Sequence, residues 1–117
     1  MIVDDDKNIV VVGFSYGSAG SAYIFKYDLE GNLIWSDQWG GEDYDRFDHI
    51  FLQSDGYLVF GSTESVTVEG LNPSSSSMVG RDSVILKYDF NGNIVWQKRY
   101  SANGLYSDIK SMHVNQN

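Results

Sequence analysis

The sequence predicts an all-β fold composed of β-propeller blades, each of them a sheet of four antiparallel strands. Three observations lead to this prediction: a repeated sequence, four strand-like segments in the complete repeat, and no helical periodicity over more than two turns. The repeat is about 48 residues long, and four antiparallel strands in roughly 45–50 residues is the period of a propeller blade. A β-sandwich has strands at similar spacing, but its sequence does not repeat this closely.

The repeat consists of two close matches within the chain. Residues 23–35 align without a gap with residues 84–96, and residues 8–13 align with residues 56–61. The spacing changes from 48 residues in the second match to 61 in the first. This change places an insertion at about residues 66–78, where four consecutive serines after a proline indicate a loop.

The repeat divides the chain into three parts. Residues 1–40 form a first blade with a truncated first strand, residues 41–100 form a second blade, and residues 101–117 supply the first strand of a following blade. Two blades and a spare strand do not close a ring of about 4–8 blades. The chain is therefore either a piece of a longer propeller or one of several copies that assemble head to tail.

The two ends of the chain match the same strand of the repeat. Residues 2–4 correspond to the tail of a first strand, with Ile2 aligned with Ile50, and residues 107–115 form a longer copy of that strand. In an assembly the two segments would compete for one position. We expect the C-terminal strand to displace the N-terminal residues, because an unpaired apolar edge is unfavourable.

The strand segments are rich in Val, Ile, Leu and aromatic residues and are bounded by turn residues. In the second copy they are residues 48–53, 57–63, 83–88 and 93–100. An Asp-x-x-Gly sequence precedes the last strand in both copies, which predicts a hairpin loop whose glycine takes a positive φ. In the last strand Ile94, Trp96 and Lys98 share one face, and Val95 and Gln97 share the other.

Several repeated positions are predicted to be structural. Trp35 and Trp96 follow their hairpins at equivalent positions. We expect both to pack between blades, because a blade buries its face only against a neighbour. The full set of repeated structural positions is Gly13, Asp28, Gly31, Trp35, Gly61, Asp89, Gly92 and Trp96.

Composition excludes several functional classes. The net charge of −8 disfavours nucleic acids and anionic membranes as partners, because both attract basic surfaces. Without cysteine the chain has no disulfide, thiolate metal site or thiol nucleophile. No apolar run approaches the ~18 residues of a membrane span.

The titratable residues do not form a recognisable catalytic or metal-binding pattern. Residues 40–48 contain four carboxylates, but their spacing fits no EF-hand loop, so we interpret them as a solvated loop. Asp4 to Asp6 are interpreted as a solvated turn. His49 and His113 align one position apart and have no partner at a ligand spacing. We therefore predict no catalytic, metal-binding or cofactor-binding residues.

The repeated turns resemble those of a known propeller family. Asp28-x-x-Gly31-x-x-x-Trp35 and the matching residues 89–96 resemble the tryptophan-docking motif of quinoprotein (PQQ-like) propeller repeats, although the turn is one residue shorter and its threonine is replaced. Residues 54–61 and 86–96 are similar to repeats of bacterial surface and secreted proteins. The resemblance implies a propeller fold and a bacterial surface or extracellular location. A cytoplasmic location stays open.

The sequence favours a non-enzymatic scaffold or binding module whose partners are other propeller blades, either in further copies of itself or in a longer chain. Carbohydrate is a candidate ligand at residues 66–80, because loops on one propeller face carry function and tyrosine and tryptophan are plentiful. One alternative, implied by the family resemblance, is a fragment of a PQQ-type oxidoreductase, although no cofactor pocket is recognisable. The other is a self-assembling partial propeller without a small ligand.

Overall fold

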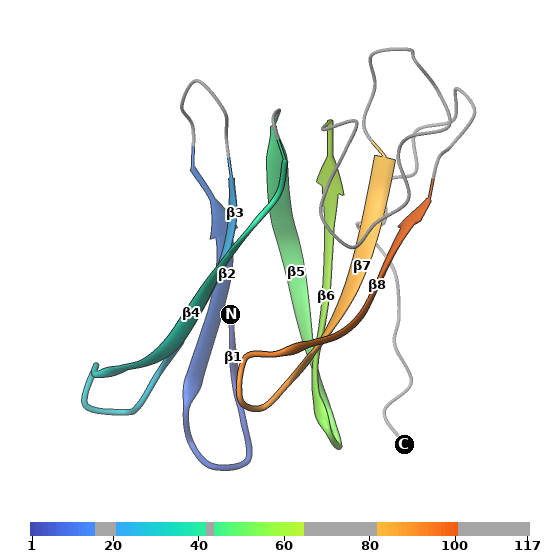
Figure 1. Cartoon of the computed structure of the whole chain (residues 1–117). Helices are drawn as coiled ribbons and strands as arrows, with labels where there is room; N and C mark the ends of the chain where they lie inside the picture. Colours follow the sequence, from blue (N-terminus) through green and yellow to red (C-terminus); the bar gives the residue numbers. More distant parts are fainter. Residues whose placement is uncertain (16–20, 42–43, 65–81, 101–117) are drawn as a thin grey trace.

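The computed structural model describes residues 1–15, 21–41, 44–64 and 82–100, which form two antiparallel β-sheets (Figure 1). The first sheet contains β1 (Ile2–Val3), β2 (Ile9–Phe14), β3 (Ala22–Tyr27) and β4 (Leu33–Trp39), in that order. The second contains β5 (Asp45–Gln53), β6 (Gly56–Thr63), β7 (Asp82–Asp89) and β8 (Ile94–Tyr100). The predicted all-β class and the four antiparallel strands per repeat are confirmed. The described residues contain no helix, and so none that could span a membrane.

Both sheets are meanders in which each strand pairs with the next strand in the chain. The two sheets also share an irregularity in the pairing of their last two strands. The β3–β4 register shifts between Lys26 and Tyr27, and the β7–β8 register shifts between Lys87 and Tyr88. These positions are equivalent in the sequence repeat, so the two sheets share a local backbone distortion as well as a strand order.

The two sheets pack face to face, with β5 against β1, β2 and β3 (Figure 1). Alternation along each strand selects the residues that enter this interface. The core consists of Val10, Ala22, Ile24 and Trp39 from the first sheet, and of Phe47, Ile50, Tyr57, Val59, Val84, Leu86 and Tyr88 from the second. One face of the first sheet therefore covers the opposing face of the second.

The structure corrects the prediction for the N-terminal strand. Ile2 lies opposite Val10 in β2, whose repeat equivalent Leu58 lies opposite Phe51 in β5. Ile2 therefore matches Phe51 and not Ile50, because the β1–β2 turn is one residue longer than the β5–β6 turn. In the single chain β1 pairs with β2. The expected displacement of the N-terminal residues concerns an assembly and stays a prediction.

Some predicted segments lie outside the described residues. They are the insertion at residues 66–78, the proposed ligand region at residues 66–80, and the spare strand at residues 107–115, together with His113. The described residues form two open sheets.

Candidate functional site

The strongest candidate site is the junction where the first sheet meets the β7–β8 turn. This turn is built around Asp89, whose carboxylate accepts hydrogen bonds from the backbone N–H of Asn91 (2.9 Å) and Asn93 (3.0 Å). The Asn93 side chain donates to the second carboxylate oxygen at 3.2 Å. Gly92 has a φ of 91°, as predicted for the glycine of this loop. The hydrogen bonds by which Asp89 closes the turn are thus all local.

The β3–β4 turn has the same construction. Asp28 accepts from the backbone N–H of Glu30 and Asn32, each at 2.9 Å, and from the Asn32 side chain at 3.0 Å. Gly31 has a φ of 86°. Hydrogen bonds from Asn32, backbone and side chain, lower the pKa of Asp28, and those from Asn93 do the same for Asp89.

A third turn of this type, which the sequence analysis missed, joins β1 to β2. Asp4 accepts from the backbone N–H of Asp6 (3.0 Å) and Asn8 (2.9 Å), and Lys7 takes the place of the glycine with a φ of 69°. The signal in the sequence is Asp-x-x-Lys-Asn beside two copies of Asp-x-x-Gly-Asn. The turn was overlooked because a lysine stands where the other two turns have glycine, and lysine rarely adopts a positive φ.

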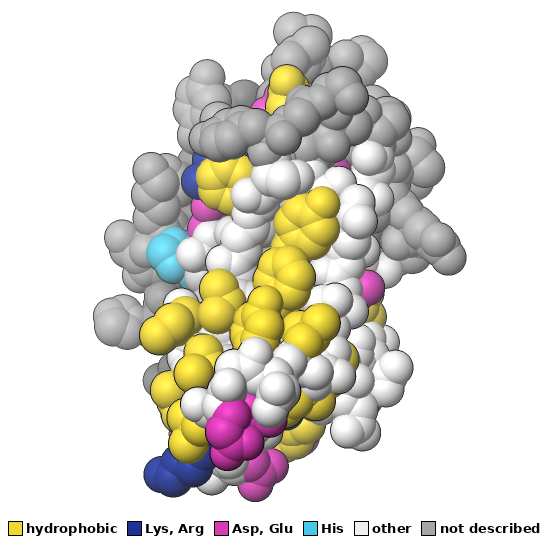
Figure 2. All heavy atoms as spheres, turned by 90° about the vertical axis from the view of Figure 1, so that its left-hand side faces the viewer, with side chains coloured by type: hydrophobic (Ala, Val, Ile, Leu, Met, Phe, Trp, Pro, Cys, Tyr) yellow, Lys and Arg dark blue, Asp and Glu magenta, His cyan; other side chains and the backbone are white. Residues whose placement is uncertain are grey.

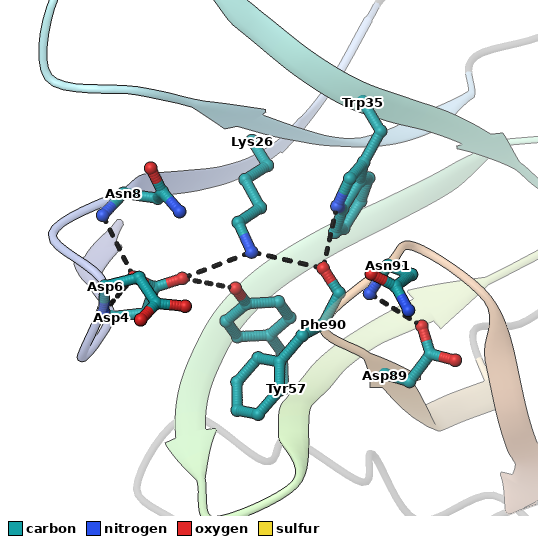
Figure 3. A network of polar contacts seen from close by, with 9 residues as sticks. All are labelled: Asp4, Asp6, Asn8, Lys26, Trp35, Tyr57, Asp89, Phe90 and Asn91. Atoms are coloured by element: carbon teal, nitrogen blue, oxygen red, sulfur yellow. Dashed lines mark hydrogen bonds and ion pairs between the residues drawn. The ribbon is translucent and has the colours of Figure 1, made fainter.

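Trp35 joins the two sheets by docking on the Asp89–Gly92 turn (Figure 3). Its indole N–H donates to the carbonyl oxygen of Phe90 at 3.0 Å. Its ring stacks on Tyr88, with centroids 6.2 Å apart and planes 16° apart. A Cβ placed on Gly92 would lie 2.7 Å from the Trp35 ring, so the glycine makes room for the tryptophan. Trp35 therefore packs between the two sheets.

A buried polar cluster lies beside the docked tryptophan (Figure 3). The ammonium of Lys26 lies 3.3 Å from the Asp4 carboxylate and donates to the Phe90 carbonyl at 3.1 Å. The Tyr57 hydroxyl donates to the same Asp4 carboxylate at 2.6 Å. Asp4 and Lys26 are both buried, so the solvated turn predicted for Asp4 to Asp6 is wrong for Asp4. Asp5 and Asp6 are exposed.

Burial and hydrogen bonding fix the protonation states in this cluster. Burial on its own would raise the pKa of Asp4, but hydrogen bonds from Tyr57, from the Asn8 N–H and from Lys26 outweigh it, and the pKa lies below its ordinary value. Burial and the neighbouring carboxylate raise the pKa of Tyr57. The cluster therefore contains an ionised Asp4 and a protonated Tyr57 at neutral pH, which is the state that holds the sheets together.

Two further hydrogen bonds cross between the sheets. The Tyr88 hydroxyl donates to Asp37 at 2.9 Å, and burial followed by this carboxylate raises the pKa of Tyr88. The indole N–H of Trp39 donates to the side-chain oxygen of Gln97 at 2.9 Å. Trp39 is buried against Phe47, at a centroid distance of 5.5 Å. The sequence analysis missed Trp39, because its equivalent position in the repeat holds Tyr100.

The remaining repeated positions behave differently in the two sheets. Trp96 is 40% exposed in the single chain, whereas Trp35 packs between the two sheets. Gly61 lies at the β5 bulge, where a Cβ would overlap the Arg46 carbonyl, whereas a Cβ on Gly13 would meet nothing within 4 Å. Gly31 is likewise open. Of these glycines, the two that a neighbour crowds thus lie in the second sheet: Gly61 is crowded by β5 of its own sheet, and Gly92 by Trp35 of the first sheet.

The interpretation of residues 40–48 as a solvated loop is wrong for one of its carboxylates. Asp45 is buried and accepts hydrogen bonds from the Thr63 hydroxyl and the Gly41 N–H, so it closes a turn and is not solvated. Asp48 is exposed and pairs with Arg46 at 2.7 Å. Residues 42 and 43 lie outside the described residues.

No second centre of chemistry emerges from the described parts of the chain. They contain no group of three or more His, Asp or Glu side chains that could hold a metal ion. A pocket of about 170 Å³ lies between Phe14, Tyr44, Arg46 and Glu64, and it is small compared with the ~300–1,000 Å³ of ligand pockets. The polar groups at the sheet junction are engaged with one another, so the junction is built for association of sheets.

Comparisons with known proteins add no assignment. No model of a protein family matches this chain, and no curated protein is similar to it.

Proposed function

We propose that this chain is a two-blade segment of a β-propeller that serves as a non-catalytic scaffold or binding module of a bacterial surface or secreted protein. The observation that carries the proposal is the docking of Trp35 on the Asp89–Gly92 turn of the next sheet. The same turn and the same tryptophan recur in the sequence with a spacing of 61 residues, so the contact can repeat from sheet to sheet. Propeller blades are four-stranded meanders that bury each face against the adjacent blade. Both described sheets have this strand order, and one face of the first sheet packs on the opposite face of the second, so that a further sheet could pack on each in the same way.

A scaffold role is supported by the use of the polar residues. Asp4, Lys26 and Tyr57 form a closed set of contacts between the sheets, and Asp28 and Asp89 are occupied by their own turns. These groups stabilise the arrangement. Carbohydrate remains the candidate ligand of the insertion, and a glycan array without signal for the full chain would remove it.

A fragment of a PQQ-type oxidoreductase is the second candidate, favoured by the resemblance of the Trp35 and Trp96 motifs to the quinoprotein repeat. The two candidates differ in what binds the folded chain. A ligand that binds only the native state raises the melting temperature. We expect the full chain to have the same melting temperature with Ca²⁺ and pyrroloquinoline quinone together as with Ca²⁺ alone. A rise that requires the quinone would contradict the scaffold proposal.

A further inference from the structure

The outer face of the first sheet, turned away from β5 to β8, is apolar and aromatic (Figure 2). Along β3 the rings of Tyr23, Phe25 and Tyr27 stack on one another, with centroids 5.7 and 6.2 Å apart. Their partners across the ladder include Val11 and Ile9 in β2. All five side chains are partly exposed.

The equivalent face of the second sheet is covered. The residues that match Tyr23, Phe25 and Tyr27 are Val84, Leu86 and Tyr88, and each is fully buried. They lie in the core that the first sheet covers, and Trp35 stacks on the last of them. The same set of positions is thus a finished interface in one sheet and a partly exposed face in the other.

The turn next to this face is preformed in the receiving conformation. Gly31 has nearly the same φ as Gly92, 86° against 91°, but a Cβ on Gly31 would meet nothing within 4 Å, whereas one on Gly92 would meet Trp35. Leu29, the equivalent of Phe90, is 63% exposed. The first sheet therefore presents both the aromatic face and the glycine turn that receive a tryptophan in the second sheet.

The second sheet of the same chain carries a tryptophan that could dock on such a turn. Trp96 lies opposite Lys87 in the β7–β8 ladder, as Trp35 lies opposite Lys26 in the β3–β4 ladder. Lys87 is buried and held by Gln53 and Asp55, in the way that Asp4 holds Lys26. Trp96 and its lysine thus reproduce the pair that docks on the Phe90 carbonyl within the chain.

We infer that a second copy of this chain docks Trp96 on the outer face of the first sheet. The indole N–H donates to the Leu29 carbonyl, and the ring stacks on Tyr27 against Gly31. This inference rests on the proposed function as a propeller segment. The contact is head to tail, so it repeats from copy to copy and closes when the rotation permits. Because propellers have roughly 4–8 blades, closure takes about two to four chains.

One substitution makes the joint between copies weaker than the joint within a chain. Asp37 accepts the hydrogen bond from Tyr88, and its repeat equivalent is Lys98, which has no acceptor for the Tyr27 hydroxyl. The docking of Trp96 consequently depends on the stacked ring and on the Leu29 carbonyl.

The test is the molar mass of the full chain by light scattering on a size-exclusion column, with matched variants. Wild type is expected to form a closed assembly of two to four copies of the 13.2 kDa chain. Trp96→Ala is expected to raise the dissociation constant about 30-fold or more, as for a central interface tryptophan. Val95→Ala removes a neighbouring side chain that is 58% exposed and points to the opposite face, and it leaves the mass unchanged.

A mixing experiment tests the direction of the contact. Tyr27→Lys removes the receiving side and keeps Trp96, whereas Trp96→Ala removes the inserting side and keeps Tyr27. Each variant alone is expected to be monomeric, and an equimolar mixture is expected to form a 1:1 complex that grows no further. Phe25→Lys replaces Tyr27→Lys if near-ultraviolet circular dichroism shows that the latter is unfolded.

The outcomes separate this inference from the proposed function. A wild-type chain that stays monomeric at its highest soluble concentration, or an assembly that Trp96→Ala leaves intact, overturns the docking of a second copy. The proposed function is tested within one chain by the energetic coupling between Trp35 and Gly92 in a double-mutant cycle. A monomer that retains this coupling overturns only the self-assembly, whereas a chain without the coupling contradicts the propeller segment.

Discussion

At the scale of single residues, the matched glycines Gly31 and Gly92 separate two reasons for glycine in a turn: a positive φ and a lack of space for a side chain. Both adopt a positive φ, which L-side chains rarely adopt. Only Gly92 also has a ring against it, because a Cβ there would lie 2.7 Å from Trp35. The pair therefore distinguishes strain of the backbone from crowding by the docked tryptophan.

We expect Gly31→Ala to lower the free energy of unfolding by about 1–2 kcal/mol, the cost of a left-handed alanine. Gly92→Ala is expected to cost roughly 1–3 kcal/mol more, because the added methyl group overpacks the junction. Urea denaturation of the two variants measures the difference. In a Trp35→Ala background the two costs should become equal, and a difference that persists there would show that Trp35 is not its cause.

Lys7 occupies the position that glycine holds in the other two turns, at a φ of 69°. Lys7→Gly is expected to raise the free energy of unfolding by roughly 0.5–1 kcal/mol, since relief of the left-handed strain exceeds the entropic cost of glycine. Asp5→Gly in the same turn is the control and should bring no gain. Equal effects of the two changes in chemical denaturation would argue that the turn of Lys7 is unstrained.

At the scale of elements, the ends of β1, β3 and β6 are tied together by one carboxylate. Asp4 binds the Lys26 ammonium and the Tyr57 hydroxyl while it holds its own turn. A buried acceptor of this kind is unfavourable unless all its partners are present. The contact is therefore sensitive both to substitution and to acid.

The pKa of Asp4 is lower in the folded chain than in the unfolded one, so Asp4 adds stability above its unfolded value of about 3.9. This stability is lost as the pH falls through the lower folded value. Tyr57→Phe removes one of the hydrogen bonds that lower the pKa. We expect the variant to be less stable at neutral pH by about 1–3 kcal/mol and to lose less stability between pH 7 and strong acid. Urea midpoints across that range measure both effects, and parallel pH curves would show that Tyr57 does not control Asp4.

The strands and turns were predictable from the sequence because they depend on local chemistry. Asp-x-x-Gly-Asn closes its own loop, and alternation along a strand is visible residue by residue. The contact of Asp4 with Tyr57 was not predictable, because it joins residues 53 positions apart across two sheets. One signal was overlooked: Lys26 and Lys87 recur in register with the apolar core positions, and a buried lysine requires a partner.

At the scale of the whole molecule, stability depends on the contact between sheets. A single four-stranded sheet leaves an apolar face in water, and the first sheet covers that face of the second. The inter-sheet contact is made by the core together with the docked Trp35. Loss of Trp35 should therefore lower the stability of the chain more than loss of its repeat equivalent, Trp96.

Trp35→Ala is expected to lower the free energy of unfolding by roughly 2–4 kcal/mol, because it leaves a cavity and an unsatisfied Phe90 carbonyl. Trp96→Ala, measured on dilute monomer, should cost less than about 1 kcal/mol, since its ring is 40% exposed. Guanidinium denaturation compares them. Similar losses for both would mean that Trp35 does not dock in solution.

The self-contained turns also bear on the order in which the chain folds. The β3–β4 and β7–β8 hairpins each close over a short stretch of sequence, so the Asp28 and Asp89 loops can form without help from distant residues. The insertion of Trp35 on the Phe90 carbonyl spans 55 positions and requires both loops to be complete. The receiving turn and the strand of Trp35 can thus form separately, and we expect the packing of the two sheets to follow as the slower step of folding.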